Sequence, residues 1–315
     1  MDMSELHSRL GKVEFSRLHC TLLCERETHL TLADCLGLRP PLQRTTKALV
    51  ELGALLHHDA KSLFDPPPFP DPEARRKFQT PAPPFVFRWE PESFKTYTEG
   101  EEFHFELLLL GVAVPRLDVY VRVLECLARE SFAEAGSFEL NEISGLDDSG
   151  NSHKVWISGD AMEGLVSPVC TADWWVMQHE AMLEPLTLRL VTPARLMSQG
   201  KPLFKPAFLD LLPFMLRRVT SLCYAHADVL LLDDVQPVIE DGRDIVSSCR
   251  LSWEDWRQPS GQADMELGGL MGDCELSGPG VKQLSWLLSL GELFQVGRGA
   301  AYGAGKIELC ASLPG

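Results

Sequence analysis

The sequence predicts an α+β protein in which the order strand, helix, strand, strand, helix, strand occurs twice. Apolar residues alternate over the expected strands and recur every three or four positions over the expected helices, in the same order in both halves of the chain. The chain has 315 residues, 45% of them hydrophobic, which is long enough for two separate hydrophobic cores. We therefore expect two domains of similar architecture.

The first copy is predicted within residues 1–145. Its expected strands and helices are a strand over 15–24, a helix over 41–57, strands over 85–89 and 102–114, a helix over 115–129 and a strand over 137–143. Between the first helix and the second strand, the segment 65–84 contains many prolines. We predict an open loop there, because proline lacks a backbone N–H and does not fit the interior of a helix or of a central strand.

The second copy is predicted within residues 183–315, after a connection over 146–182. Its expected elements are a strand over 185–191, a helix over 207–226, strands over 247–256 and 264–275, a helix over 281–290 and a strand over 305–311. The β-α-β-β-α-β order is that of the ferredoxin-like (RRM-like) domain. The prediction is thus a pair of tandem ferredoxin-like domains.

Composition excludes several classes of protein. The longest apolar runs are much shorter than the ~20 residues that span a bilayer, and the first residues lack the basic and apolar regions of a signal peptide. We expect a cytoplasmic protein that does not bind membranes. The nine cysteines lack C-x-x-C spacing and predict reduced thiols. His19, Cys20 and Cys24 have no second ligand pair nearby, so we expect no metal or cofactor.

The net charge of −16 opposes general attraction to phosphate. A nucleic-acid site would need a local basic surface on this acidic chain. Basic residues do predominate from residue 191 to 226, where they are Arg195, Lys201, Lys205, Arg217 and Arg218.

Glycines gather near the end of the chain, between the last predicted helix and the last strand. They are Gly297, Gly299, Gly303 and Gly305, interspersed with Arg298 and Tyr302 and followed by Lys306. Such a loop can turn its N–H groups toward phosphates, while arginine and lysine add charge and tyrosine a stacking surface. A dinucleotide fingerprint and a Walker loop are both excluded by the position of the glycines and the residues after them. A tight helix-to-strand connection is the alternative explanation.

The run from Leu287 to Leu309 resembles the C-terminal signature of the CRISPR-associated RAMP endoribonucleases, which process precursor CRISPR RNA. Three other segments are similar to that family: Thr192–Arg195, Arg217–His226, and the stretch from Trp253 through Arg257 to Gly272. The resemblance covers most of residues 185–315 and is weaker over 40–115.

The resemblance implies tandem ferredoxin-like domains, CRISPR repeat RNA as a partner, and cleavage without metal. In that chemistry the 2′-hydroxyl attacks the adjacent phosphate and leaves a 2′,3′-cyclic phosphate. Other CRISPR effector or adaptation proteins are further expected partners. The RNA-binding residues it implies are Lys201, Lys205, Arg217, Arg218, Arg257, Gly297, Arg298, Gly299, Tyr302, Gly303, Gly305 and Lys306.

Many members of the family carry a catalytic histidine in or just after the first helix. Here that helix has Arg44-Thr-Thr-Lys47, and the nearest histidines are His57 and His58, with Lys61 close behind. We predict these three as the catalytic residues, since histidine can exchange protons near neutral pH. A helix that merely ends in histidines is the simple alternative. His19 and His29 are weaker candidates.

Two other functions stay open. A catalytically silent RNA-binding subunit of a CRISPR effector complex is favoured by the missing histidine and the acidic charge. An interaction protein that keeps the fold without binding RNA is the other.

Overall fold

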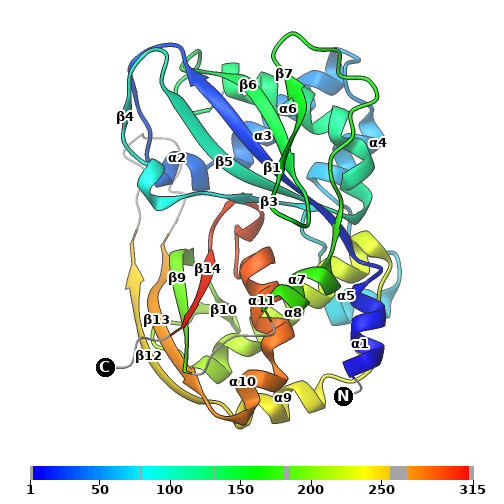
Figure 1. The fold of residues 1–315 in the computed structure, drawn as a ribbon, viewed down its shortest axis with the longest axis vertical. Helices are drawn as coiled ribbons and strands as arrows, with labels where there is room; N and C mark the ends of the chain where they lie inside the picture. The colour runs from blue at the N-terminus through cyan, green and yellow to red at the C-terminus, as the bar shows by residue number, and fades with distance from the viewer. Residues whose placement is uncertain (1–2, 79, 131, 180–184, 256–267, 312–315) are drawn as a thin grey trace. The chain divides into compact units, whose positions relative to one another are not determined.

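The computed structural model describes residues 3–78, 80–130, 132–179, 185–255 and 268–311. The chain divides into two compact units. One is Glu14–Cys170, here called the first unit, and the other, the second unit, combines Met1–Val13 with Thr171–Gly315. Each unit contains an antiparallel sheet and its own set of helices (Figure 1).

The sheet of the first unit has the strand order β3-β5-β1-β6-β7. These strands are β1 (Glu14–Cys24), β3 (Phe85–Arg88), β5 (Glu102–Leu110), β6 (Phe138–Leu146) and β7 (Ser152–Ile157). On the central strand β1, Leu18, Cys20 and Leu22 alternate with more polar residues and are buried, as period-two patterning requires. Short strands β2 (Thr28–His29) and β4 (Thr96–Tyr97) pair with each other outside this sheet.

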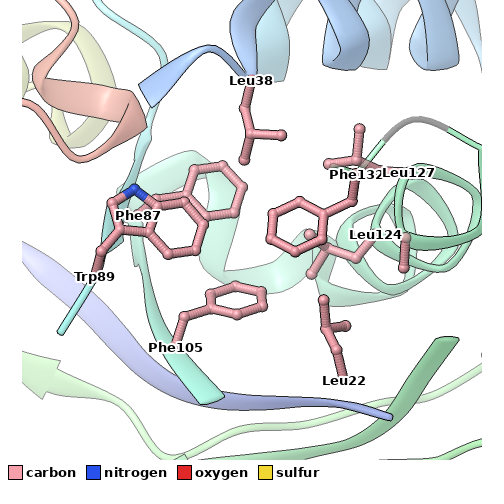
Figure 2. A pocket seen from close by; sticks show the side chains of 9 residues that line it. Leu22, Leu38, Phe87, Trp89, Phe105, Leu124, Leu127 and Phe132 are labelled. Carbon is pink, nitrogen blue, oxygen red and sulfur yellow. The ribbon is translucent and has the colours of Figure 1, made fainter. Parts of the chain in front are cut away.

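Helices of the first unit complete the plan. They are α2 (Leu32–Leu36), α3 (Arg39–Glu51), α4 (His57–Asp59), a π-helical turn (Ala60–Phe64), α5 (Pro72–Phe78) and α6 (Leu117–Glu130), with 3-10 turns at Pro91–Ser93 and Gly111–Arg116. The core between α6, α3 and the sheet is rich in aromatic rings, with Phe87 and Trp89 stacked at 5.2 Å. This core contains a cavity of about 10 Å³. Figure 2 shows its lining, which consists of four aromatic side chains, Phe87, Trp89, Phe105 and Phe132, and of aliphatic ones. The cavity has room for about one water molecule, so it is a packing gap and not a substrate site.

Helix α5 contradicts the expectation that the whole proline-rich segment 65–84 is an open loop. Pro72 stands at the start of the helix, where its missing N–H costs nothing. The carboxylate of Asp71 accepts the N–H groups of Glu73 and Ala74 at 3.3 and 2.8 Å. One short helix therefore fits between the two groups of prolines.

The sheet of the second unit has the order β12-β13-β9-β14. Its strands are β9 (Leu186–Ala194), β12 (Val246–Glu254), β13 (Gly269–Ser277) and β14 (Ile307–Ala311). Its helices are α1 (Met3–Leu10), α7 (Ala172–His179), α8 (Phe208–Ala227), α9 (Gln236–Arg243), α10 (Pro279–Gln283) and α11 (Ser285–Phe294). The single helix expected over 281–290 is thus divided between α10 and α11. Within this unit α7 packs on α11, where the indole N–H of Trp175 donates to the carbonyl of Ser289 at 2.9 Å.

The two sheets share one topology. Numbered within each copy, both have the spatial order second, third, first, fourth strand, which is the ferredoxin-like arrangement. The prediction of tandem ferredoxin-like domains is confirmed.

The two units differ in three places from the predicted division into a first domain at 1–145, a connection at 146–182 and a second domain at 183–315. Helix α1 groups with the second unit, where His7 lies 2.5 Å from Asp173 of α7. Strand β7 adds a fifth strand to the first sheet, in a stretch expected to be part of the connection. Strand β8 (Cys170–Thr171) and helix α7 lie further along the same stretch.

Two of the nine cysteines are joined, contrary to the expectation of reduced thiols only. Cys249 of β12 and Cys274 of β13 form a disulfide, with Cα atoms 4.0 Å apart. The register places them directly opposite each other, a relationship that their separation of 25 positions conceals. The other seven cysteines are free.

No helix in the described parts of the chain is long and apolar enough to cross a membrane.

Candidate nucleic-acid interface

The glycine-rich segment, residues 297–305, connects α11 to β14 in the second unit and is anchored on the end of β9. The N–H of Arg298 donates to the carbonyl of Arg195 at 2.9 Å, and the N–H of Gly305 donates to that of Pro193 at 3.0 Å. The N–H of Val296 in turn donates to the carbonyl of Gly305 at 3.0 Å. The segment is therefore fastened at both of its ends.

Glycine is required at several of these positions. Gly297, Gly299, Gly303 and Gly305 all have positive φ, between 65° and 96°. At Gly305 an added Cβ would lie 1.8 Å from the carbonyl oxygen of Val296. At Gly297 it would lie 2.9 Å from the carbonyl oxygen of Arg195. The backbone approaches itself too closely here for any side chain.

A buried threonine, Thr192, supports the glycine-rich segment. The sequence indicated it only as the first residue of Thr192–Arg195 and not as a site residue. The hydroxyl of Thr192 donates to the carbonyl of Gly303 at 2.7 Å and accepts the N–H of Lys306 at 2.8 Å. Thr192 is 1% exposed, so these partners replace the water that its hydroxyl loses. The segment Thr192–Arg195 thus functions as the support of the glycine-rich segment.

Most backbone N–H groups of the segment are used internally, which differs from the expected phosphate cradle. The N–H groups of Tyr302, Gly303 and Ala304 donate to carbonyls of Gly299 and Ala300. This makes a 3-10 turn over Ala300–Tyr302. Within the described part of the chain, hydrogen bonds use none of the N–H groups of Gly297, Gly299, Ala300 and Ala301. Of these four residues, Ala300 and Ala301 are buried, whereas Gly297 and Gly299 are accessible to solvent.

The charged and aromatic side chains of the segment differ in accessibility. Arg298 is exposed. Lys306 is 3% exposed, and its ammonium lies 3.4 Å from the carboxylate of Glu308. Tyr302 is also buried. Lys306 and Tyr302 were expected to contact RNA, but burial gives them the role of packing and pairing beneath the segment.

The two arginines of α8 also have different environments. The guanidinium of Arg218 donates through Nε to the carbonyl of Phe294, the last residue of α11, at 3.2 Å. Burial lowers the pKa of Arg218 to about 10, because the charged form loses its hydration. Arg217 lies 5.3 Å from the ring of Phe214 and is half-buried. Arg218 is half-buried as well, and its hydrogen bond joins α8 to the end of α11; RNA binding by Arg218 stays a prediction.

A small β-hairpin follows β9 and lies next to the glycine-rich segment. It consists of β10 (Met197–Ser198) and β11 (Lys201–Pro202), which turn through Gln199 and Gly200 with φ of 50° and 79°. The N–H of Leu203 donates to the carbonyl of Leu196 at 3.0 Å and closes the hairpin beside Arg195. Lys201 and Lys205, on and after this hairpin, are exposed.

The sheet register brings these features to one end of the second sheet. Trp253 pairs with Leu270, and Leu270 pairs with Ala194. The following residue, Arg195, forms the bridge to Arg298. This sheet end, defined by Trp253, Ala194–Arg195, the hairpin and the glycine-rich segment, gathers the exposed positive charge of Arg298, Lys201 and Lys205. Arg257 lies outside the described residues.

The predicted catalytic residues belong to the first unit. His57 and His58 are exposed at α4, and Lys61 on the next turn lies 3.3 Å from the carboxylate of Asp65. Within the described residues, neither histidine side chain has a hydrogen bond or an ion pair. On α3, Arg44 is exposed and Lys47 lies 3.8 Å from Glu51. The first helix thus offers cations and no histidine.

Among the described residues, no group of three or more His, Cys, Asp or Glu is arranged to hold a metal ion.

The sequence of this region matches a family model. The model of the CRISPR-associated endoribonuclease Cas6 matches residues 188–307, which include β9, the hairpin, α8 and the glycine-rich segment. This region is similar in sequence to the Cas6 endoribonucleases. The resemblance to the CRISPR-associated RAMP family is thereby confirmed. A second model, described as an N-terminal domain, matches residues 56–168. Curated protein sequences give no match.

Solved structures share the fold of this chain. A Cas6 from Thermus thermophilus is 16% identical with a TM-score of 0.51, and the match covers 95% of this chain and 99% of that one. A Cas6 product complex is 17% identical with a TM-score of 0.51, over 95% and 100%. A partial Cas6-RT-Cas1–Cas2 complex is 15% identical with a TM-score of 0.61, over 96% of this chain.

The present chain spans 46% of the protein in that partial complex and 29% of the corresponding chain in a further Cas6-RT-Cas1–Cas2 complex. At these identities the likeness shows the fold.

Proposed function

We propose that this protein binds CRISPR repeat RNA and cuts precursor CRISPR RNA as a metal-independent endoribonuclease. The observation that carries the proposal is the exposed side chain of Arg298. It extends from a segment whose backbone is fixed by main-chain hydrogen bonds and by glycines with positive φ. The guanidinium can bind a phosphate with two parallel N–H···O hydrogen bonds, and its planar shape reduces the entropy lost for each bond. The exposed Lys201 and Lys205 at the same sheet end extend the positive surface.

In this proposal, exposed groups of the glycine-rich segment bind RNA, and buried side chains hold the segment in its conformation. Arg298 and the N–H groups of Gly297 and Gly299 face the RNA backbone. The buried layer of Thr192, Tyr302 and Lys306 keeps the segment in place. Sequence-independent contact with phosphates fixes the RNA in position, and the bases are read by other groups.

The proposed cleavage is an internal transesterification. A base removes the proton of a 2′-hydroxyl, and the oxygen attacks the adjacent phosphorus. The bond from phosphorus to the 5′-oxygen breaks, and that oxygen takes a proton from an acid. The products are a 2′,3′-cyclic phosphate and a 5′-hydroxyl. We assign the base and the acid to His57 and His58, with Lys61 balancing the charge of the crowded phosphate.

A catalytically silent RNA-binding subunit is the second candidate. It is favoured by α3, which presents Arg44 and Lys47, and by the two exposed histidines, whose rings no described residue orients. A general base normally has a partner that fixes its ring. Retained RNA affinity with no cleavage would identify this case.

Association with other CRISPR proteins also belongs to the proposal. Two structures that share this fold are named as complexes of Cas6, RT, Cas1 and Cas2. We propose that this chain acts beside effector or adaptation proteins of the same kind. Co-purification with the products of its own locus would test this.

The deciding experiment is cleavage of a labelled repeat RNA in EDTA, beside the same RNA carrying a 2′-deoxy sugar at the cut. Cutting of the first and not the second supports the proposed enzyme. Tight binding without cutting supports the silent subunit. Neither binding nor cutting overturns both.

A further inference from the structure

Two aromatic side chains, the exposed Phe204 and the half-buried Trp253, lie in contact at the same sheet end. Phe204, between the β10–β11 hairpin and α8, is 55% exposed. Its ring centroid lies 5.0 Å from that of Trp253, the rings being inclined by 57°. Most other aromatic rings of the chain are buried in the two cores. The accessible phenyl ring, in contact with the indole, offers a flat apolar surface to a ligand.

The tryptophan of the pair is held in a fixed orientation. Its indole N–H donates to the carboxylate of Asp255 at 2.8 Å. Gly268 leaves space beside it, since an added Cβ there would lie 3.1 Å from Nε1 of Trp253. The hydrogen bond to Asp255 orients the indole against which Phe204 packs.

The surroundings of the pair indicate what it binds. Phe204 is followed directly by the exposed Lys205 and preceded by the exposed Lys201, in a protein of net charge −16. An aromatic surface next to cations is the combination that binds single-stranded nucleic acid, because each nucleotide brings a flat base and a phosphate. On the other side, Asp255 and Glu254 repel phosphate. This difference in charge directs the phosphate backbone of a bound nucleic acid toward the lysines and its base toward the aromatic rings.

We propose that Phe204 and Trp253 form a stacking subsite for one unpaired nucleobase of the bound RNA. The inference rests on the proposed function, which it extends from phosphate binding at Arg298 to recognition of an unpaired base. Any base can stack there, because every base offers a flat π surface. The subsite therefore selects single-stranded RNA over duplex rather than one sequence.

The test compares two strands of equal length and charge, a short oligoadenylate and its abasic ribose-phosphate counterpart. The unmodified protein should bind the oligoadenylate more tightly. Phe204→Ala should lower that affinity about 5- to 100-fold and leave affinity for the abasic strand unchanged. Phe204→Trp should restore the preference. Leu209→Ala, which removes another exposed apolar side chain nearby, is the matched control and should change neither affinity.

Salt dependence provides a second readout. Phe204→Ala should leave the slope of affinity against salt unchanged, whereas Lys201→Ala should reduce it. If Phe204→Ala keeps the full preference for the base-bearing strand, the subsite is overturned while RNA binding stands. The pair would then be a surface for a protein partner. If the unmodified protein binds neither strand nor its repeat RNA, the proposed function fails and the subsite with it.

Discussion

The main-chain N–H of Arg298 donates to the main-chain carbonyl of Arg195, 103 positions earlier in the chain, at 2.9 Å. The contact joins the tip of the glycine-rich segment to the end of β9 and to the start of the lysine-bearing hairpin. This main-chain hydrogen bond therefore sets the position of the Arg298 backbone, from which the exposed guanidinium extends. RNA binding at this sheet end should depend on both the charge and the backbone.

The charge is tested by Arg298→Ala. Loss of one phosphate contact should lower affinity for repeat RNA about fivefold at physiological salt and reduce the salt slope by about one. Arg250→Ala is the control, because Arg250 is 79% exposed on β12 of the same sheet and its removal changes net charge equally. Filter binding over a salt series measures both quantities. Equal losses in the two variants would mean that only net charge matters.

The backbone is tested by Gly305→Ala. The added Cβ would meet the carbonyl oxygen of Val296 at 1.8 Å, at a φ of 65°. We expect a loss of about 2–4 kcal/mol in the free energy of unfolding, since strain and overpacking add. Gly53→Ala is matched, with a φ of 71° and nothing within 4 Å, and should cost only about 1 kcal/mol. Denaturant unfolding compares them. Similar losses would show that the close approach to Val296 is not maintained in solution.

Sequence alone was sufficient for the elements whose patterns are local. The alternation of Leu186, Leu188 and Leu190 predicts β9, because their common face is the buried one. The short edge strand β7 was missed, since its first three residues are exposed and show no apolar alternation. Helix α5 was missed because proline at the first turn looks the same in sequence as proline in a loop.

The candidate site was predicted less well, because burial and long-range contact decide its roles. Lys306 was interpreted as an RNA contact, since a basic residue in the sequence gives no sign that the fold will bury it. Thr192 was not recognised, because its partners Gly303 and Lys306 are 111 and 114 positions away. The disulfide was missed for the same reason.

The disulfide between Cys249 and Cys274 should contribute measurably to stability. Closing a loop of this length restricts the unfolded chain, and reduction should lower the free energy of unfolding by about 3 kcal/mol. Cys249→Ser should show the same loss and no further response to reductant. Cys310→Ser, at an exposed free cysteine, is the control. Alkylation in denaturant without reductant should modify seven of the nine cysteines; modification of all nine would refute the bond.

The assignment of catalysis to His57 and His58 is tested by changing both to alanine. If they supply the base and the acid, the rate of repeat-RNA cleavage should fall at least about 100-fold, while affinity stays within a few-fold because the phosphate contacts lie in the second unit. His153→Ala is the control, at another exposed histidine of the first unit, 2.7 Å from Asp147. Single-turnover cleavage with excess protein separates the chemical step from RNA binding. An unchanged rate in the double variant would remove the pair from the mechanism. Arg44 and Lys47 of α3, where the family's histidine is expected, would then be the next residues to change, since a phosphate bound there could still be cut with a base from another element.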